Sequence, residues 1–195
     1  MKFEILNKER IFDEFFKIDK AQVKHERFNG KSWNQVTRYG LQRPEAVAVL
    51  LENTSKNTVI MVEQFRYATV NLTDRDGWML EIVAGMIDNG ETPEQSAKRE
   101  TLEEVGYKIT HLDHLYSYFA SIGISDERVH IYHAEVKEED KISEGGGLKT
   151  ENEDLAIREI PFLELFDLIK NGKIVDSKTI IASQWLAIKK GVSLV

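Results

Sequence analysis

The sequence predicts an α/β fold in which helices cover both sides of a mixed sheet, with a region of antiparallel strands before it. Short apolar runs of strand length alternate with segments whose apolar residues recur at helical spacing. The first 40 residues lack such runs, because their aromatic residues are separated by polar ones, a pattern that predicts strands. A chain of 195 residues can form one domain with a small added element. We therefore expect an N-terminal strand region over 1–40 and an α/β domain over 41–195.

The expected strands follow from these patterns. Residues 11–41 contain two or three antiparallel strands, with a hairpin signal at Asn29-Gly30. Ala46–Leu51 and Val59–Phe65 are apolar runs separated by a turn-forming segment, as in buried strands. Two more strands are expected at about Ile109–Phe119 and Arg128–Val136.

A first helix is expected after the apolar stretch Met79–Ala84. Its start is predicted at Thr92, because Thr92 and Gln95 can form a capping box and Pro93 is favoured at the first helical position. Its end is predicted at Gly106, which can adopt the left-handed conformation past the last turn.

Two more helices follow a loop of glycine and acidic residues at 143–154. One is expected from about Pro161 to Asn171, and the other from about Ser177 to Lys190. The apolar stripe that the last helix is expected to bury consists of Ile180, Ile181, Trp185 and Ile188.

Composition excludes several classes of function. The formal charge of −7 opposes general binding to nucleic acid, because phosphate contacts need clustered Lys and Arg. The absence of cysteine excludes disulfides and thiolate sites. No apolar run approaches the roughly 18 residues of a membrane-spanning helix, so we expect a cytoplasmic protein without a membrane partner. The histidines form no ligand set, since His130 and His133 are three apart on one expected strand and face opposite ways.

Three carboxylates dominate the first helix. At about 100° per residue, Glu103 and Glu104 lie within roughly 60° of Glu100, so the three share one face. Like charges one turn apart destabilise a helix by about 0.2–0.5 kcal/mol per pair. A bound cation would remove this repulsion, and oxygen ligands favour Mg²⁺ or Mn²⁺. The alternative is a solvated acidic face without a metal.

Residues 85–107 resemble the sequence box of the Nudix hydrolases. The segment GMIDNGETPEQSAKRETLEEVGY fits G-x5-E-x7-R-E-U-x-E-E-x-G-U, where U is a bulky apolar residue. Thr101 and Tyr107 depart from the pattern at two U positions, which carry no chemistry. The matching residues are Gly85, Glu91, Arg99, Glu100, Glu103, Glu104 and Gly106. The resemblance implies the Nudix α/β/α sandwich and metal-dependent hydrolysis of a nucleoside diphosphate linked to another group.

Other segments resemble the nucleoside-diphosphate-sugar pyrophosphatase branch of that family. They are EQFRYA at 63–68, EIVAGMIDNGE at 81–91, ASIGISDERVHIYHAEV at 120–136 and GGGLKTENED at 145–154. This resemblance implies cleavage to a nucleoside monophosphate and a sugar phosphate, and an N-terminal strand domain that builds a homodimer. ADP-ribose, GDP-mannose and UDP-glucose remain open as substrates, since Ile122 stands where ADP-ribose enzymes usually have proline.

By the same resemblance, the box supplies most of a metal site. Glu100 and Glu104 bind two or three Mg²⁺ or Mn²⁺ ions with the carbonyl of Ala84, and Glu103 adds a third carboxylate that is also a catalytic candidate. Glu153, from the acidic loop, is a further ligand. The residues that support these ligands without binding metal are Gly85, Glu91 and Arg99.

The resemblance assigns the remaining roles to residues outside the box. Glu151 is the general base that activates water, with Glu153 or Asp154 as open alternatives. The glycines at 145–147 let this loop close over substrate. Arg66 grips the pyrophosphate, and the alternative for it is a surface ion pair. Stacking and guanidinium recognition make Trp33, Arg38 and Arg43 candidates for nucleotide contact, and the resemblance adds Glu127 for the terminal sugar.

Two other functions fit parts of the sequence. A Nudix enzyme acting on dinucleotides or nucleoside triphosphates would share the box, but such enzymes typically lack the N-terminal strand region. A catalytically silent nucleotide-sugar sensor would share the fold. Such a sensor need not keep the acidic set Glu100, Glu103, Glu104 and Glu151.

Overall fold

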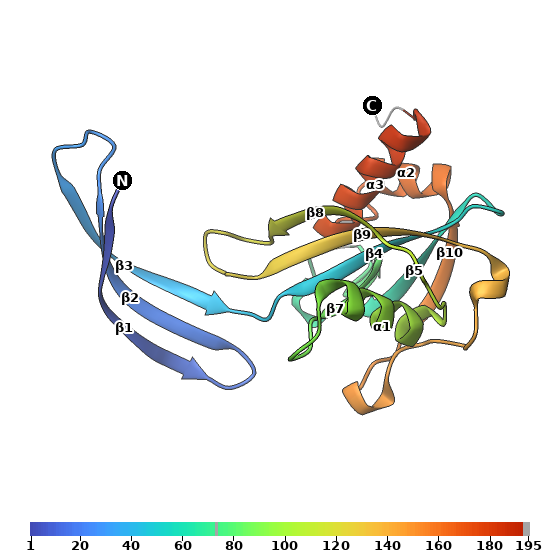
Figure 1. Ribbon diagram of the computed structural model, residues 1–195, viewed down its shortest axis with the longest axis horizontal. Helices are drawn as coiled ribbons and strands as arrows, with labels where there is room; N and C mark the ends of the chain where they lie inside the picture. The colour runs from blue at the N-terminus through green and yellow to red at the C-terminus, as the bar shows by residue number, and fades with distance from the viewer. Residues whose placement is uncertain (73, 193–195) are drawn as a thin grey trace. The chain divides into compact units, whose positions relative to one another are not determined.

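The computed structural model describes residues 1–72 and 74–192. Their strands and helices are β1 (Phe3–Asp13), β2 (Lys17–Glu26), β3 (Trp33–Gln42), β4 (Ala46–Asn53), β5 (Thr58–Phe65), β6 (Trp78–Glu81), β7 (Val83–Met86), α1 (Pro93–Val105), β8 (Asp113–Phe119), β9 (Arg128–Val136), β10 (Ala156–Pro161), α2 (Phe162–Lys170) and α3 (Ser177–Lys190). Figure 1 shows these elements along the chain. The chain divides into two compact units. The strand unit comprises Met1–Glu45 and Phe119–Arg128, and the sheet unit comprises Ala46–Tyr118 and the chain from Val129 onward.

The strand unit is built from β1, β2 and β3, which pair antiparallel in that order. The expected turn between β2 and β3 is confirmed, with Gly30 at φ 65°. The first strand begins at Phe3, before the expected region 11–41. Charged residues interrupt Phe3–Asp13, and all of its residues are exposed, so the sequence there lacks an apolar pattern. In the same unit, the Leu41 N–H donates to the Ile124 carbonyl at 2.7 Å.

The sheet unit contains a mixed sheet. Among the described residues its order is β10-β5-β4-β9-β8, with β6 paired to β5 and β7 paired to β4. β4 and β9 are parallel, whereas β4 is antiparallel to β5 and to β7. The first half of β4 pairs with β7, and its last residues pair with β5. Because β6 in turn pairs with β5, the short strands β6 and β7 lie between β4 and β5 in the sheet.

Helices cover both faces of this sheet, so the predicted sandwich is confirmed (Figure 1). One core cluster packs α1, through Ala97 and Val105, against side chains of β4, β5 and β9. The other packs α2 and α3 against the opposite face, with Leu165 and Leu186 fully buried. Successive side chains along each strand point to opposite faces of the sheet, so they pack into two separate apolar layers.

The structure corrects several expected elements. β8 begins at Asp113 instead of Ile109, and the stretch Met79–Ala84, for which no element was predicted, forms parts of two short strands. β10 was not expected, because Arg158 and Glu159 interrupt its apolar pattern. The expected stripe of α3 is wrong at Ile188, which is 78% exposed. The buried residues of α3 are Thr179, Ala182, Ser183, Leu186 and Ala187.

The expected boundaries of α1 are confirmed. The Thr92 hydroxyl accepts from the Gln95 N–H at 3.3 Å, and the Gln95 side chain accepts from the Thr92 N–H at 2.8 Å. Gly106 ends the helix with φ 80°. These local contacts fix the two ends of the helix and therefore the positions of its acidic residues.

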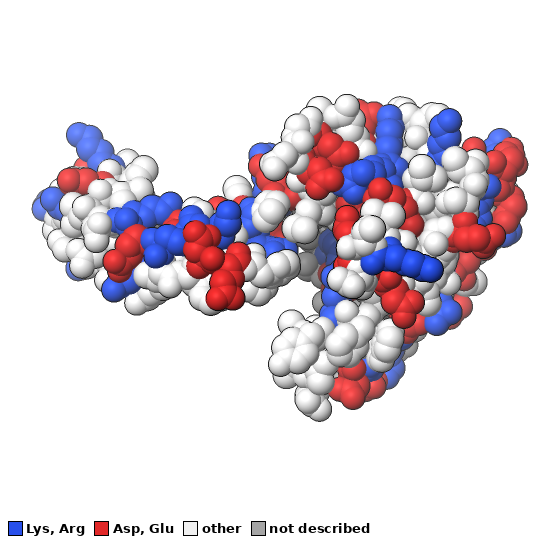
Figure 2. Space-filling view, turned by 90° about the horizontal axis from the view of Figure 1, so that it is seen from below, with Lys and Arg blue, Asp and Glu red and all other residues white. Residues whose placement is uncertain are grey.

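No helix in the described parts of the chain is long and apolar enough to cross a bilayer. On the face drawn in Figure 2, basic and acidic side chains are interspersed. The formal charge of −7 is therefore not gathered into one acidic field on that face.

Candidate active site

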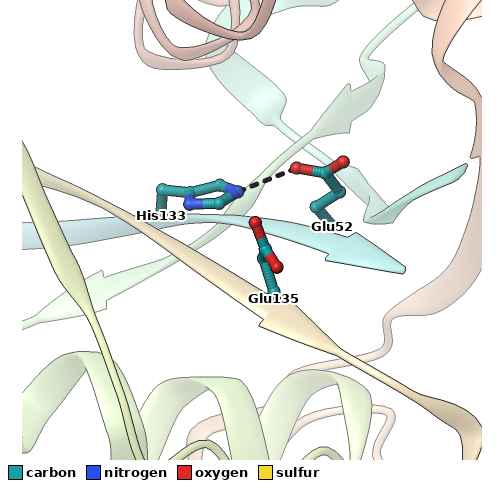
Figure 3. Close-up of side chains that lie close together, drawn as sticks. All are labelled: Glu52, His133 and Glu135. Atoms are coloured by element: carbon teal, nitrogen blue, oxygen red, sulfur yellow. Dashed lines mark hydrogen bonds and ion pairs between the residues drawn. The ribbon is translucent and has the colours of Figure 1, made fainter. Parts of the chain in front are cut away.

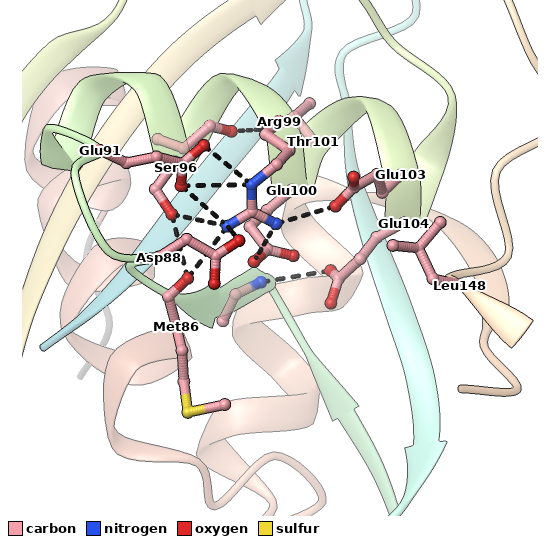
Figure 4. A network of polar contacts seen from close by, with 12 residues as sticks. Met86, Asp88, Glu91, Ser96, Arg99, Glu100, Thr101, Glu103, Glu104 and Leu148 are labelled. Carbon is pink, nitrogen blue, oxygen red and sulfur yellow. Dashed lines mark hydrogen bonds and ion pairs between the residues drawn. The ribbon is translucent and has the colours of Figure 1, made fainter. Parts of the chain in front are cut away.

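The acidic residues of α1 point into the protein. Glu104 is 1% exposed and Glu100 is 8% exposed, whereas Glu103 is half-buried. The Ala84 N–H of β7 donates to Glu104 Oε2 at 3.2 Å (Figure 4). The helix therefore directs two carboxylates against the strand that precedes it, instead of exposing an acidic face to water.

Gly85 allows this close packing. A Cβ added there would lie 2.0 Å from Cδ and Oε1 of the Glu100 carboxylate. That separation is far shorter than a van der Waals contact, so any side chain at position 85 would displace the carboxylate. The glycine is required here by contact with Glu100 and not by a left-handed backbone, since its φ is not positive.

The buried carboxylates have perturbed acidities. Burial, together with the charges of Glu103 and Glu153, raises the pKa of Glu100 to about 7 against the opposing charge of Arg99. Burial and the charge of Glu100 raise the pKa of Glu104 well above its ordinary value. Two carboxylates held together away from water favour either a proton or a cation between them. This donor set fits a divalent cation.

Arg99 orients the acidic residues around this pair (Figure 4). Its Nη1 donates to Glu100 Oε1 at 2.8 Å and to Glu103 Oε2 at 2.9 Å. Its Nε donates to Glu91 at 3.1 Å, and its Nη2 donates to the Met86 carbonyl at 3.1 Å. The structure thus brings Glu91 and Arg99 together and ties the loop before α1 to the carboxylates.

The glycine-rich loop packs against the end of α1. The Gly146 N–H donates to the Glu104 carbonyl at 2.8 Å, and the Gly147 N–H donates to the Glu103 carbonyl at 3.1 Å. All three glycines of the run 145–147 have positive φ. Their conformational freedom is therefore used to dock the loop on the helix terminus.

Docking of this loop brings Glu153 to the α1 acids. The Leu148 N–H donates to Glu153 Oε2 at 3.0 Å, and the negative charge of Glu153 contributes to the raised pKa values of Glu100 and Glu104. Glu151 ends a short 3-10 turn and is exposed. Of Glu151 and Glu153, Glu153 is the one that the structure groups with the buried pair.

A second charged group lies next to these acids. Arg66 donates to Glu81 through Nε at 2.8 Å and Nη2 at 3.0 Å. Lys178, from the first turn of α3, pairs with the same carboxylate and with Asp176. Although burial opposes it, hydrogen bonding from Arg66 and the charge of Lys178 lower the pKa of Glu81 to about 2. Glu81 lies three residues before Ala84, whose N–H donates to Glu104, and the negative charge of Glu104 helps to raise the pKa of Arg66.

Glu81 and Lys178 were not predicted as site residues from the sequence. The two are 97 residues apart in the chain, so no local pattern connects them. One signal was available, because a lysine in the first turn of a helix is unfavourable beside the positive end of the helix dipole. Such a lysine needs a nearby carboxylate, and Asp176 and Glu81 supply it.

The predicted substrate-contact residues of the strand unit have partners of their own. Arg43 pairs with Glu127 at 3.5 Å and lies over the rings of Phe15 and Phe16. Trp33 lies under the Lys24 ammonium at 4.8 Å. The last of the four, Arg38, donates to the carbonyl of Thr37. Since these residues belong to the unit that does not hold α1, their role in binding substrate stays a prediction.

Comparison with known proteins identifies relatives over nearly the whole chain. Residues 42–182 match the family model of the NUDIX domain. The ADP-ribose pyrophosphatase of Escherichia coli K12 is 34% identical over 185 residues, which cover 94% of this chain and 87% of that protein. The GDP-mannose pyrophosphatase of Pectobacterium atrosepticum is 33% identical over 186 residues, which cover 95% and 94%. A crystal structure of an ADP compounds hydrolase shares the fold with a TM-score of 0.75 at 22% identity, covering 99% of this chain and 98% of that one.

Proposed function

The chain belongs to the Nudix family, and we propose that it hydrolyses the pyrophosphate bond of a nucleoside diphosphate sugar to a nucleoside monophosphate and a sugar phosphate. The observation that carries this proposal is the buried pair Glu100 and Glu104, packed against Gly85 and Ala84. The names of the ADP-ribose and GDP-mannose pyrophosphatases among its relatives support this class of substrate.

The proposed cation ligands are Glu100, Glu104, Glu153 and the carbonyl of Ala84. Burial and mutual repulsion destabilise the charged carboxylates, so a divalent cation between them would offset both costs. Two or three Mg²⁺ or Mn²⁺ ions would neutralise the pyrophosphate and polarise it toward attack. Arg99 holds Glu100 in place.

Arg66 and Lys178 are the proposed phosphate-binding cations. Glu81 fixes both side chains, and 43% of the Arg66 side chain remains exposed. A guanidinium held by a bidentate contact loses little freedom when it also binds a phosphate oxygen. We therefore assign Arg66 to the pyrophosphate and Lys178 to the group next to it.

Glu151 is the proposed general base. A base must accept a proton from water, which a carboxylate already bound to a metal does poorly. Glu151 is exposed and shares its loop with Glu153, which is grouped with the α1 acids. The two neighbours can therefore act on the same substrate through different chemistry.

Residues 1–40 are proposed to dimerise the protein. This region exposes several large apolar side chains, and contiguous exposed apolar surface marks interaction sites. They include Phe3, Ile5, Phe15, Phe16 and Phe28. A second copy of the chain would cover them, and residues 41–195 are the proposed catalytic domain.

The test of the proposed function is a substrate panel assayed with Mg²⁺ and with Mn²⁺. ADP-ribose, GDP-mannose and UDP-glucose are compared with diadenosine polyphosphates and nucleoside triphosphates. We expect the highest kcat/KM on one of the three nucleotide sugars. Glu104→Gln, which is nearly isosteric, should abolish this activity while remaining folded. A preference for dinucleotides or triphosphates would reject the proposed substrate class, and inactivity on every compound would favour a silent sensor.

A further inference from the structure

A second buried charged cluster lies at the opposite end of α3 from Lys178. Glu52 of β4 is 2% exposed and His133 of β9 is 1% exposed. Glu52 Oε2 and His133 Nε2 are 3.0 Å apart (Figure 3). The last turn of α3 reaches the same carboxylate, because Lys190 pairs with Glu52 Oε1 and Lys189 Nζ lies 3.6 Å from Oε2. None of these groups has a role in the proposed chemistry.

Glu52, His133 and Glu135 together resemble a set of metal ligands, since their ligand atoms lie within 4.8 Å of one another (Figure 3). The chain itself supplies the cations here. Lys189 Nζ lies 2.8 Å from Glu135 Oε1 as well as near Glu52, and Lys190 occupies the other oxygen of Glu52. A divalent ion would meet two ammonium groups, so the cluster is better described as an ion-pair anchor for the helix.

The two ends of α3 are thus attached to different parts of the sheet. At the first turn, Asp176 accepts from the Thr179 N–H at 3.0 Å, and Thr179 Oγ1 accepts from the buried Ile82 N–H at 3.0 Å. Ile82 is the residue after Glu81, which pairs with Lys178. At the last turn the attachment is the Glu52 cluster. Lys178 and Lys190 are about 18 Å apart along a continuous helix.

A rigid helix attached at both ends transmits a shift along its axis from one end to the other. The ring of Trp185 lies 4.8 Å from that of His133, which adds a contact one turn before the lysines. Loss of the Glu52 charge would leave Lys189, Lys190 and His133 in a partly buried space without their shared carboxylate. The last turn would then move, and the position of Lys178 beside Arg66 would change with it.

We propose that Glu52 is a positioning residue for the substrate site, acting through α3 on Lys178. The proposal rests on the proposed function, in which Lys178 contacts the substrate. Glu52 itself is not proposed to touch substrate or metal. Its loss should therefore weaken substrate binding more than it slows the chemical step.

A double-mutant cycle between Glu52→Gln and Lys178→Met tests the proposal. In the wild-type background, E52Q should raise KM for the preferred nucleotide sugar by about tenfold and change kcat less than about twofold. In the K178M background, E52Q should leave KM unchanged, because the residue through which it acts is missing. The same KM increase in both backgrounds, or none in either, would overturn the proposal.

Two further variants separate positioning from loss of fold. Glu135→Gln is the matched control, because Glu135 is an exposed partner of Lys189 and its loss leaves the Glu52 contacts in place. It should keep the wild-type KM. If E52Q fails to fold, Lys190→Met replaces it in the cycle, with the same expected coupling to K178M. Hydrogen exchange of the α3 amides should rise in E52Q and K190M but not in E135Q, and equal protection in all three would contradict the anchor.

The outcomes also distinguish this proposal from the proposed function. If the wild-type enzyme hydrolyses no nucleotide sugar, both the proposed function and the positioning role of Glu52 are rejected. An active wild-type enzyme whose E52Q and K178M effects multiply independently rejects only the positioning role.

Discussion

Replacing Gly85 with alanine should disable the acidic site while leaving the fold intact. The added Cβ would lie 2.0 Å from the Glu100 carboxylate, whereas ordinary contacts begin at 3.4 Å. The carboxylate must therefore move by more than about 1 Å to relieve the overlap. Because a misplacement of about 1 Å at a reacting centre can cost about 10²-fold in rate, we expect kcat/KM to fall by about 10²-fold or more.

The assay for this variant is steady-state hydrolysis over a series of Mg²⁺ concentrations, with thermal unfolding measured in parallel. The clash involves the end of a flexible side chain, so the Tm of G85A should stay close to that of the wild type. Gly40→Ala controls for the loss of backbone freedom in the Tm measurement, since nothing in the same chain lies within 4 Å of its Cβ position and its φ is not positive. Wild-type kcat/KM in G85A at wild-type Mg²⁺ concentrations would refute the assigned packing of Glu100 against Gly85.

Four other perturbations test three separate parts of the molecule. Glu153→Gln should raise the Mg²⁺ concentration needed for half-maximal activity, whereas Glu151→Gln should lower kcat by about 10²–10⁴-fold with an unchanged metal titration, and the opposite pattern would exchange their roles. Hydrogen bonding from His133, with the charges of the α3 lysines, lowers the pKa of Glu52 to about 2 from its ordinary 4.5. Its stabilising contribution is thus present above about pH 4.5 and is lost as the pH falls towards 2, so the difference in unfolding free energy between wild type and Glu52→Gln should shrink by on the order of 2 kcal/mol between pH 7 and pH 3. Denaturant titrations at the two pH values measure this difference, and a pH-independent value would contradict the ion pairing. Deletion of residues 1–40 should remove dimers in sedimentation velocity together with activity, whereas a folded, active monomer would overturn the assigned interface.

Local chemistry explains which parts of the fold could be predicted. The boundaries of α1 depend on the side chain of Thr92, the ring of Pro93 and the conformational freedom of Gly106, all of which act within a few residues. The strands β4 and β5 are continuous apolar runs. In contrast, β10 pairs along β5 through main-chain hydrogen bonds, and its charged side chains gave no periodic signal.

The site shows the same division. The spacing of Glu100 and Glu104 predicts that they share a helix face, but not that this face is buried. Their burial depends on Gly85 and on the strand that carries it, which is a tertiary contact. Lys178 was missed for the same reason, because its partner Glu81 is 97 residues away in the chain. Whether the strand unit contributes to the site stays a prediction.

The proposed cleavage of the pyrophosphate bond is tested by hydrolysis of the preferred nucleotide sugar in ¹⁸O-labelled water, with the products identified by mass spectrometry. We expect a nucleoside monophosphate and a sugar phosphate, with one ¹⁸O atom in only one of the two phosphates. Neither product should form without Mg²⁺ or Mn²⁺. Release of inorganic pyrophosphate or of free sugar would contradict attack on the pyrophosphate bond.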